Sequence, residues 1–307
     1  MTDLTDLTDL TDLTDMTGDR KVIIQISDVH ITGDGLLHDH VDSLDNLVTI
    51  LSSIEQAGSP PDLLLFTGDL ADKGEPAAYR RFRETVEPFA ERLGVPVLYV
   101  PGNHDSRAPF REHLLAAAPA DDTIDQVLWL DGLRIVALDS TAPPRHHGEL
   151  EEHQLAWLKA ELATPAPLGT ILALHHPPIG GPSKFLDILT LRAPERLAAA
   201  IAGSDVLMIV AGHTHHASAG ALAGIPVWVA TASAYQMDVL TASAGVMRGL
   251  AGSAFSRIDV ADGSAVATHI PVLDGGAPLY QIDFETLQRA LRTSGSVEEI
   301  ESAMSNG

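Results

Sequence analysis

Five short polar clusters along the chain carry the residue types that hold transition-metal ions. Imidazoles and carboxylates bind first-row metals together, and a carboxylate such as that of Asp69 can bridge two ions. An asparagine ligand adds a carbonyl oxygen without charge. The clusters therefore predict a centre for two metal ions. Its expected ligands are Asp28, His30, Asp69, Asn103, His175, His213 and His215.

Helix and turn capping is the alternative explanation for these polar residues. Capping does not account for the pair His213 and His215, and five concordant clusters are a more specific signal than one motif. Glycine precedes Asp69, Asn103 and His213, where the backbone must turn sharply beside an ion. We therefore favour the metal centre.

The composition restricts the chemistry further. The chain of 307 residues has no cysteine, which excludes disulfides and thiolate ligands and favours harder ions such as manganese, iron or zinc. The net charge of -23 argues against a nucleic-acid duplex as partner, because duplex binding needs clustered Lys and Arg. A small phosphate ester remains compatible, since bound cations reverse the local charge.

Each cluster falls at or just beyond the end of a predicted strand. From residue 21 onward short apolar runs alternate with amphipathic stretches, which is typical of βαβ units. We predict helices at 41–56, 75–93 and 149–162, and strands at 22–26, 63–67, 97–100, 170–174 and 206–210. The carboxyl ends of such strands form the ligand crevice of open α/β sheets, so one fold can bring the clusters together.

Two hairpin signals indicate antiparallel strands as well. Asp131 and Gly132 separate apolar runs at 127–130 and 133–138, and Asp262 and Gly263 separate runs at 256–260 and 266–270. A further strand is expected at 225–231. Parallel and antiparallel strands are therefore expected in the same sheets.

The termini differ from the rest of the chain. We interpret the Thr-Asp-Leu repeat within residues 1–19 as a disordered acidic tail; a misplaced start codon and a docking segment are the alternatives. One domain is expected over 20–275, followed at 276–307 by a short helix near 284–291 and a flexible tail. The sequence has no run of roughly 18 apolar residues and no signal-peptide pattern, so a soluble cytoplasmic protein is expected.

In this order the clusters resemble the calcineurin-like metallophosphoesterase superfamily, whose motifs are Asp-x-His, Gly-Asp, Gly-Asn-His-Asp/Glu, His and Gly-His-x-His. The resemblance covers residues 21–216 and extends to about residue 272. The stretches 66–75 and 172–178 are most similar to bacterial class III cyclic-nucleotide phosphodiesterases, including the actinobacterial type. The resemblance implies an α/β fold, a four-layer α/β/β/α sandwich with two mixed β-sheets.

The resemblance also divides the ligands between the ions. It implies that Asp28, His30 and His215 hold the first ion, that Asn103, His175 and His213 hold the second, and that Asp69 bridges them. Iron and manganese are the ions expected, with zinc and cobalt as alternatives. A homodimer is expected from the resemblance alone.

Hydrolysis is expected to proceed through a hydroxide activated by the two metal ions. His104 is assigned to protonating the leaving oxygen or stabilising the phosphorane charge, and Asp105 to orienting His104. We expect the phosphate also to contact His30, Asp69, Asn103 and His215. His146 and His147 either reach the phosphate or belong to an exposed polar loop.

Other polar residues receive structural interpretations. Strand alternation predicts that His176 points away from His175, which leaves only an indirect role for it. Asp72 and Glu75 are interpreted as turn and first-turn helix residues. Surface or loop positions are expected for His38, His40, His153, His216 and His269.

The resemblance implies hydrolysis of a 3′,5′-cyclic nucleotide, foremost cyclic AMP, to the 5′-monophosphate. The alternatives are a broader phosphodiesterase for 2′,3′-cyclic nucleotides or glycerophosphodiesters, and a non-catalytic scaffold. Protein Ser/Thr phosphatases of the superfamily carry Arg and Glu where this chain has Lys73 and Asp105. That departure favours a small phosphodiester substrate over a phosphoprotein.

Overall fold

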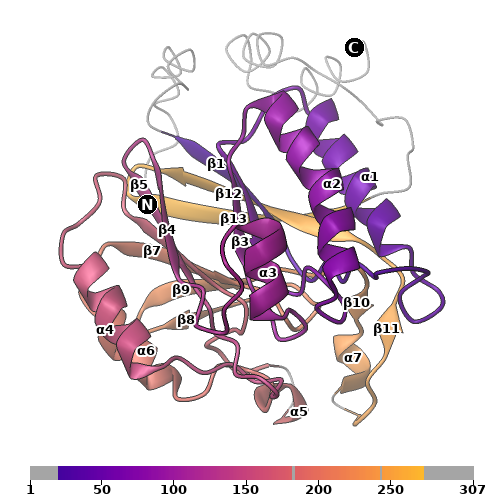
Figure 1. Ribbon diagram of the computed structural model, residues 1–307. Helices are drawn as coiled ribbons and strands as arrows, with labels where there is room; N and C mark the ends of the chain where they lie inside the picture. The colour runs from indigo at the N-terminus through magenta and orange to yellow at the C-terminus, as the bar shows by residue number, and fades with distance from the viewer. Residues whose placement is uncertain (1–19, 182–183, 243, 273–307) are drawn as a thin grey trace, which may run out of the picture. The chain divides into compact units, whose positions relative to one another are not determined.

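A computed structural model describes residues 20–181, 184–242 and 244–272. Within these ranges the chain forms two large mixed β-sheets that pack face to face, with helices outside them (Figure 1). The predicted tail at 1–19 and the predicted helix at 284–291 lie outside the described residues. The division at 20–275 and 276–307 stays a prediction.

The first sheet has five strands in the order β13-β12-β1-β2-β3. Strands β1, β2 and β3 run parallel, whereas β12 is antiparallel to β1 and forms a hairpin with β13. The bounds are β1 Lys21–Ile26, β2 Leu63–Thr67, β3 Val97–Val100, β12 Ala254–Ala261 and β13 Ser264–Pro271. The apolar runs and the second Asp-Gly turn predicted all five.

The second sheet has six strands in the order β4-β5-β6-β7-β9-β8. The inner four are parallel, and the edge strands β4 and β8 are antiparallel to their neighbours. Asp131 and Gly132 turn the β4-β5 hairpin with φ of 44° and 100°, as expected for a two-residue turn. The bounds are β4 Gln126–Leu130, β5 Leu133–Leu138, β6 Thr170–Leu174, β7 Val206–Ala211, β8 Ser218–Leu222 and β9 Ile225–Val229.

Apolar side chains divide into three clusters that define four layers. Ile23, Leu65, Ile135 and Val210 belong to the cluster between the sheets. Helices α1 Ser43–Gln56, α2 Pro76–Leu93 and α3 Arg107–Leu114 pack on the outer face of the first sheet. Helices α4 Glu152–Glu161 and α6 Pro194–Ile201 pack on the outer face of the second. The predicted four-layer α/β/β/α sandwich is confirmed.

Several elements were not predicted because their local signals are weak. Helices α3 and α6 have only eight residues each. Strand β8 is rich in small residues and is defined by its pairing with β9. The remaining short elements are α5 Lys184–Asp187, β10 Gln236–Met237, α7 Val239–Ala242 and β11 Gly249–Leu250. In the described part of the chain no helix is long and apolar enough to cross a membrane.

Candidate dinuclear metal centre

The five polar clusters follow β1, β2, β3, β6 and β7, and the structure brings them together as predicted. Backbone hydrogen bonds join the loops that carry them. Asp28 N donates to Gly68 O at 3.0 Å, His30 N to Asp69 O at 2.8 Å, and Gly212 N to His175 O at 3.0 Å. The first sheet supplies four of the expected ligands, and the second sheet supplies the other three.

Asp28, His30 and His215 form one compact group. Their candidate ligand atoms all lie within 4.8 Å of one another, and all three side chains are buried. His215 Nε2 lies 3.4 Å from Asp28 Oδ1 and 3.2 Å from His30 Nε2. These are the three residues that the resemblance implied for the first ion.

Asp69 lies between this group and the residues expected at the second ion. Its Oδ2 atom is 3.6 Å from His30 Nε2 and 3.3 Å from His175 Nε2. The same His175 nitrogen lies 3.2 Å from Asn103 Oδ1, and the His213 ring centroid is 4.9 Å from that of His175. One carboxylate oxygen thus faces a histidine from each expected set, which is the placement that a bridging ligand requires.

Backbone and side-chain acceptors orient the imidazole rings. Nδ1–H of His175 donates to Thr67 O at 2.8 Å, and Nδ1–H of His215 to Tyr235 O at 3.1 Å. His30 Nδ1 lies 3.2 Å from Asp72 Oδ1. In each ring the bond at Nδ1 directs Nε2 toward the shared interior, as outer partners of metal-binding histidines commonly do.

Five of the expected ligands have left-handed backbone conformations. The φ angles are 52° for Asp28, 49° for His30, 52° for Asp69, 74° for His213 and 55° for His215. Such conformations cost about 1–3 kcal/mol per non-glycine residue and persist where the surroundings determine them, often at functional sites. Here the Asp28 carboxylate accepts the His213 backbone N–H at 3.0 Å.

Gly68 and Gly102 have no Cβ at positions that expected ligand residues approach closely. A Cβ on Gly68 would lie 2.2 Å from His175 Nδ1, and one on Gly102 would lie 2.2 Å from Asp69 N. Both distances are far shorter than van der Waals contact. The glycines next to the ligands are therefore required by close packing, and Gly68 also has a φ of +95°.

Burial of two carboxylates controls the electrostatics of this site. Burial raises the pKa of Asp28. It opposes the ionised form of Asp69 too, but the charge and hydrogen bond of His175 outweigh it and hold the pKa of Asp69 well below its usual value. Burial likewise disfavours charged His175, yet Asp69 raises its pKa to about 9. The ionised form of Asp69 is therefore stabilised by positive charge next to it.

Burial, reinforced by the His175 charge, lowers the pKa of His213 to about 3. Neutral imidazole is the form that binds metals. Among the described residues, His213 Nε2 and His176 Nε2 are buried nitrogens without a hydrogen-bond partner. The site thus combines converging nitrogen and oxygen donors, a carboxylate stabilised by neighbouring positive charge, and a buried imidazole nitrogen without a hydrogen-bond partner. These features fit two transition-metal ions.

His104 lies beside the centre, as expected for a residue that acts on the substrate. Its Nδ1–H donates to Asp72 O at 2.7 Å, and its backbone N–H donates to Asp69 Oδ1 at 2.8 Å. Its side chain is 36% exposed, against 4% for His30 and 7% for His215. His104 is therefore open to a substrate, whereas those two histidines face inward.

Asp105 does not orient His104, and that prediction is wrong. Its carboxylate accepts three backbone N–H groups, those of Leu70, Ala71 and Gly102, and the Tyr79 hydroxyl at 3.0 Å. Burial, reinforced by Asp69, raises the pKa of Asp105 to about 6. Through these hydrogen bonds the Asp105 carboxylate links the 69–71 turn to the 102–105 turn.

Asp72 contacts both histidines of this region, through its carboxylate with His30 and through its carbonyl with His104. The sequence analysis missed this role because an aspartate three residues after Asp69 also suits a turn. Its spacing within Gly-Asp-x-x-Asp was the available signal.

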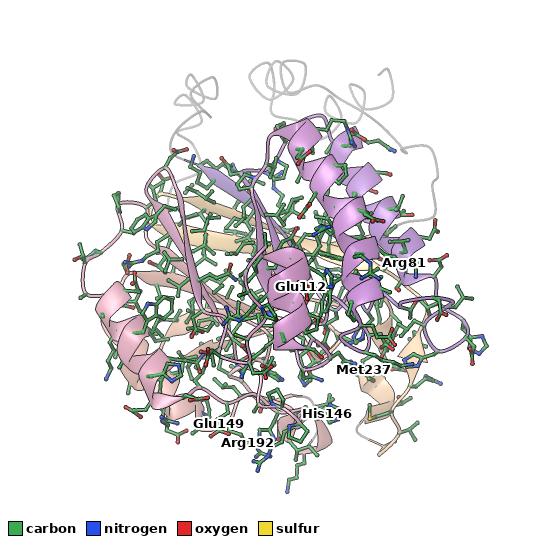
Figure 2. All side chains as sticks on the ribbon, in the orientation of Figure 1. Arg81, Glu112, His146, Glu149, Arg192 and Met237 are labelled. Atoms are coloured by element: carbon green, nitrogen blue, oxygen red, sulfur yellow. The ribbon has the colours of Figure 1, made fainter. Side chains whose placement is uncertain are left out.

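His146 and His147 differ in their surroundings, because only His146 lies beside an expected ligand. His146 Nδ1 lies 3.2 Å from Asn103 Nδ2, and its ring centroid is 6.2 Å from that of His104. His146, labelled in Figure 2, lies in the loop that follows β5. His147 has no recorded contact with the expected ligands within the described chain. Slight burial, together with Arg192 and Arg145, lowers its pKa.

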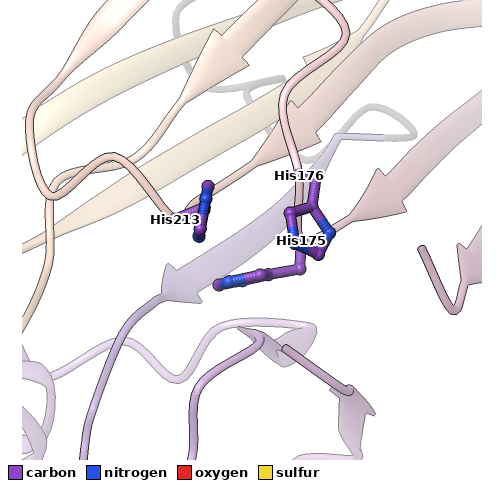
Figure 3. Close-up of side chains that lie close together, drawn as sticks. All are labelled: His175, His176 and His213. Atoms are coloured by element: carbon purple, nitrogen blue, oxygen red, sulfur yellow. The ribbon is translucent and has the colours of Figure 1, made fainter. Parts of the chain in front are cut away.

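His176 does not point away from His175, so the alternation argument fails. Strand β6 ends at Leu174, and beyond it the two rings lie 4.9 Å apart between centroids (Figure 3). His176 is fully buried, its Nδ1 lies 2.9 Å from Ser140 Oγ, and its ring centroid is 4.7 Å from that of His213. His176 therefore packs directly against the expected second-ion ligands.

The other histidines divide between surface and interior. His38, His40 and His153 are exposed, as expected. His216 is buried and donates from Nδ1 to Thr214 O at 2.8 Å, and His269 is half-buried in β13. His216 nevertheless lies in the loop between β7 and β8, so its expected loop position is confirmed, whereas His269 lies on a strand and the loop prediction is wrong for it.

Two packed mixed sheets that gather histidines and carboxylates at one set of strand ends define a metal-dependent phosphoesterase. The chain belongs to the calcineurin-like phosphoesterase family, which it matches over residues 21–217. Dimetal members of this family bind two metal ions, in agreement with the His and Asp groups found here.

Similar proteins fall within the same class. A cAMP/cGMP dual specificity phosphodiesterase of Mycobacterium tuberculosis is 50% identical over 233 residues, covering 76% of this chain and 73% of that protein. A probable cyclic nucleotide phosphodiesterase of Rhodococcus erythropolis is 43% identical over 251 residues, covering 81% and 83%. A probable glycerophosphodiester phosphodiesterase of Arcobacter nitrofigilis is 30% identical over 202 residues, covering 64% and 72%.

Solved structures support the fold. A dimetal phosphatase from Danio rerio superposes with a TM-score of 0.60 at 15% identity, covering 83% of this chain and 97% of that one. A purple acid phosphatase from yellow lupin superposes with a TM-score of 0.58 at 14% identity, covering 85% and 53%. At such identities the similarity concerns the fold alone.

Proposed function

We propose that this protein hydrolyses 3′,5′-cyclic nucleotides, foremost cyclic AMP, to 5′-monophosphates. The observation that carries the proposal is the position of Asp69, whose Oδ2 faces His30 of one expected ligand set and His175 of the other, with His104 exposed beside them. Identity of 50% to a relative named as a cAMP/cGMP phosphodiesterase supports the choice of substrate.

In this proposal Asp28, His30 and His215 hold one ion. The other is held by Asn103, His175 and His213, and Asp69 is shared. Iron and manganese are the proposed ions. Bound there, two cations supply charge that acidifies a water nucleophile and stabilises phosphoryl oxygens.

Side chains of the protein carry out the remaining steps, which are proton donation and contact with the phosphate. Water adds to phosphorus and releases a proton to solvent as the bond from phosphorus to the 3′-oxygen breaks, and solvent returns a proton to His104 after the reaction. His104 gives a proton to that departing oxygen, while its Nδ1–H remains bonded to Asp72 O. Asn103 and His146, which lie side by side, contact the phosphate from another direction. We include His30, Asp69 and His215 among the groups that line the phosphate site.

A broader phosphodiesterase that accepts glycerophosphodiesters or 2′,3′-cyclic nucleotides is the second candidate, favoured by the Arcobacter relative. The scaffold alternative has less support because the expected ligand set is complete and converged.

Metal-loaded protein should be assayed side by side on cyclic AMP, cyclic GMP, 2′,3′-cyclic AMP, glycerophosphocholine and 4-nitrophenyl phosphate. We expect the highest kcat/KM on a 3′,5′-cyclic nucleotide and the lowest on the monoester. A preference for glycerophosphocholine would replace the first candidate by the second. Absence of turnover on every diester, with both ions bound, would leave the scaffold.

A further inference from the structure

A cavity of about 660 Å³ opens beside His104. Its walls are the 32–39 loop, which follows β1, and the turn that contains Asp72, Lys73 and Glu75. The volume lies within the usual range of roughly 300–1,000 Å³ for small-molecule sites. His104 and Asp72, which contact the candidate centre, also line this cavity, so the cavity adjoins the centre at these two residues.

The position of His104 determines which part of a substrate enters this cavity. In an in-line displacement the leaving oxygen departs on the side opposite the nucleophile. His104 can protonate only an oxygen within its reach, so the group attached to that oxygen must lie on the His104 side. For a 3′,5′-cyclic nucleotide that group is the nucleoside, which stays joined to the phosphate through its 5′-oxygen.

The charge of the lining restricts what this group can be. Asp34, Asp39, Asp72 and Glu75 contribute four carboxylates, against the single ammonium of Lys73. Leu36 adds an apolar side chain, 47% exposed, at the wall. Such a lining suits an uncharged group with an apolar face and repels a further phosphate.

A second cavity of about 450 Å³ shares His38 with the first and is lined by Tyr235, Met237 and Met247. Tyr235 packs on His215, with ring centroids 4.4 Å apart, so this cavity also adjoins the candidate centre. Its described lining does not include His104, so a group bound there would not be next to the proposed proton donor.

We propose that the cavity beside His104 is the leaving-group pocket, that it takes the uncharged nucleoside, and that Asp34 and Asp39 make it select against leaving groups that carry a phosphate. This inference rests on the proposed function for the identity of the nucleoside. The cavity, its charge and its continuity with His104 stand independently of that identity.

The steric part is tested with Leu36→Trp, which fills the wall of the cavity. We expect the KM for cyclic AMP to rise about tenfold while kcat changes less than about threefold, because the reacting groups are untouched. Val266→Trp is the matched control, since Val266 is 58% exposed and lies on β13 outside the cavity. An unchanged KM in Leu36→Trp would overturn the assignment of the pocket.

The electrostatic part is tested with two competitive inhibitors, adenylyl-(3′→5′)-adenosine and the same dinucleotide with a 5′-phosphate. Both place an adenosine 3′-oxygen at the leaving position, and only the second adds charge there. We expect the phosphorylated dinucleotide to bind the unmodified protein at least fivefold more weakly. In Asp34→Lys the difference should shrink below about twofold, whereas Asp121→Lys, an exposed change outside the pocket, should retain it.

Inhibition is measured with bis(4-nitrophenyl) phosphate as reporter substrate, so the result does not depend on turnover of cyclic AMP. Equal affinity of the two dinucleotides for the unmodified protein would overturn charge selection. If cyclic AMP is not hydrolysed but the dinucleotides discriminate as expected, the proposed function fails and the leaving-group pocket stands.

Discussion

At the scale of single residues, His104 and the histidines expected as metal ligands differ in exposure. His104 is 36% exposed and bonded through Nδ1 to Asp72 O, whereas His175 is fully buried. We expect His104→Ala to retain both metal ions and to lose about 10²–10⁴-fold in kcat, the usual contribution of a general acid. Elemental analysis and steady-state kinetics on the same sample measure both quantities. His40→Ala, an exposed change, is the control, and an unchanged kcat in His104→Ala would remove its role.

Asp72 differs from His104 because its carboxylate contacts an expected ligand directly. Its carboxylate lies 3.2 Å from His30 Nδ1. Removing an outer partner of this kind typically weakens metal binding or activity about 10–100-fold. We expect Asp72→Ala to lose metal affinity in that range, with partial recovery in Asp72→Asn, which keeps an acceptor oxygen. Metal titration by calorimetry measures the affinity, and unchanged binding in the alanine variant would contradict an orienting role.

At the scale of elements, Asp105 joins the turn after β2, the turn after β3 and helix α2 through Tyr79. The Tyr79 side chain is fully buried, donates to Asp105 Oδ1 at 3.0 Å and accepts the Ser106 N–H at 2.9 Å. Tyr79→Phe leaves these partners unpaired. We expect the free energy of unfolding to fall by about 1–3 kcal/mol, measured by chemical denaturation with metal content unchanged.

Tyr99→Phe is the matched control for this experiment. Tyr99 is also buried, on β3, but no hydrogen bond of its hydroxyl is recorded in the described chain. A loss of stability in Tyr99→Phe equal to that in Tyr79→Phe would show that the Asp105 contacts contribute nothing specific.

The elements that position the site could be predicted because their signals are local. Continuous apolar runs predicted β1, β2, β3, β6 and β7, and the polar residues directly after them predicted the ligands. The left-handed backbone at Asp28 and His213 was not predictable, since it depends on hydrogen bonds between distant loops. The positions of His176 and Asp105 were mistaken for the same reason: their partners, Ser140 and Leu70, lie about 35 residues away along the chain.

At the scale of the whole described molecule, the centre forms only when the two sheets pack. The first sheet carries Asp28, His30, Asp69 and Asn103, and the second carries His175, His213 and His215. Metal binding is therefore linked to the packing of the sheets. We expect removal of both ions by a chelator to lower stability by about 5 kcal/mol, roughly 2.7 kcal/mol for each ion present at a hundredfold excess over Kd.

The matching measurement is thermal unfolding with and without chelator. Restored metal should restore Tm, because the linkage is reversible. A chelated protein with the Tm of the metal-loaded protein would show that the sheets pack without help from the ions.

The central claim is that Asp69 is shared by two ions, since its Oδ2 faces His30 at 3.6 Å and His175 at 3.3 Å. The most direct measurement is metal stoichiometry together with cyclic AMP turnover in Asp69→Asn. We predict a fall from two ions to one or none per chain and a loss of turnover of at least about 10³-fold, as expected when a two-metal clamp is broken. Two tightly bound ions with turnover equal to that of the unmodified protein would contradict the account.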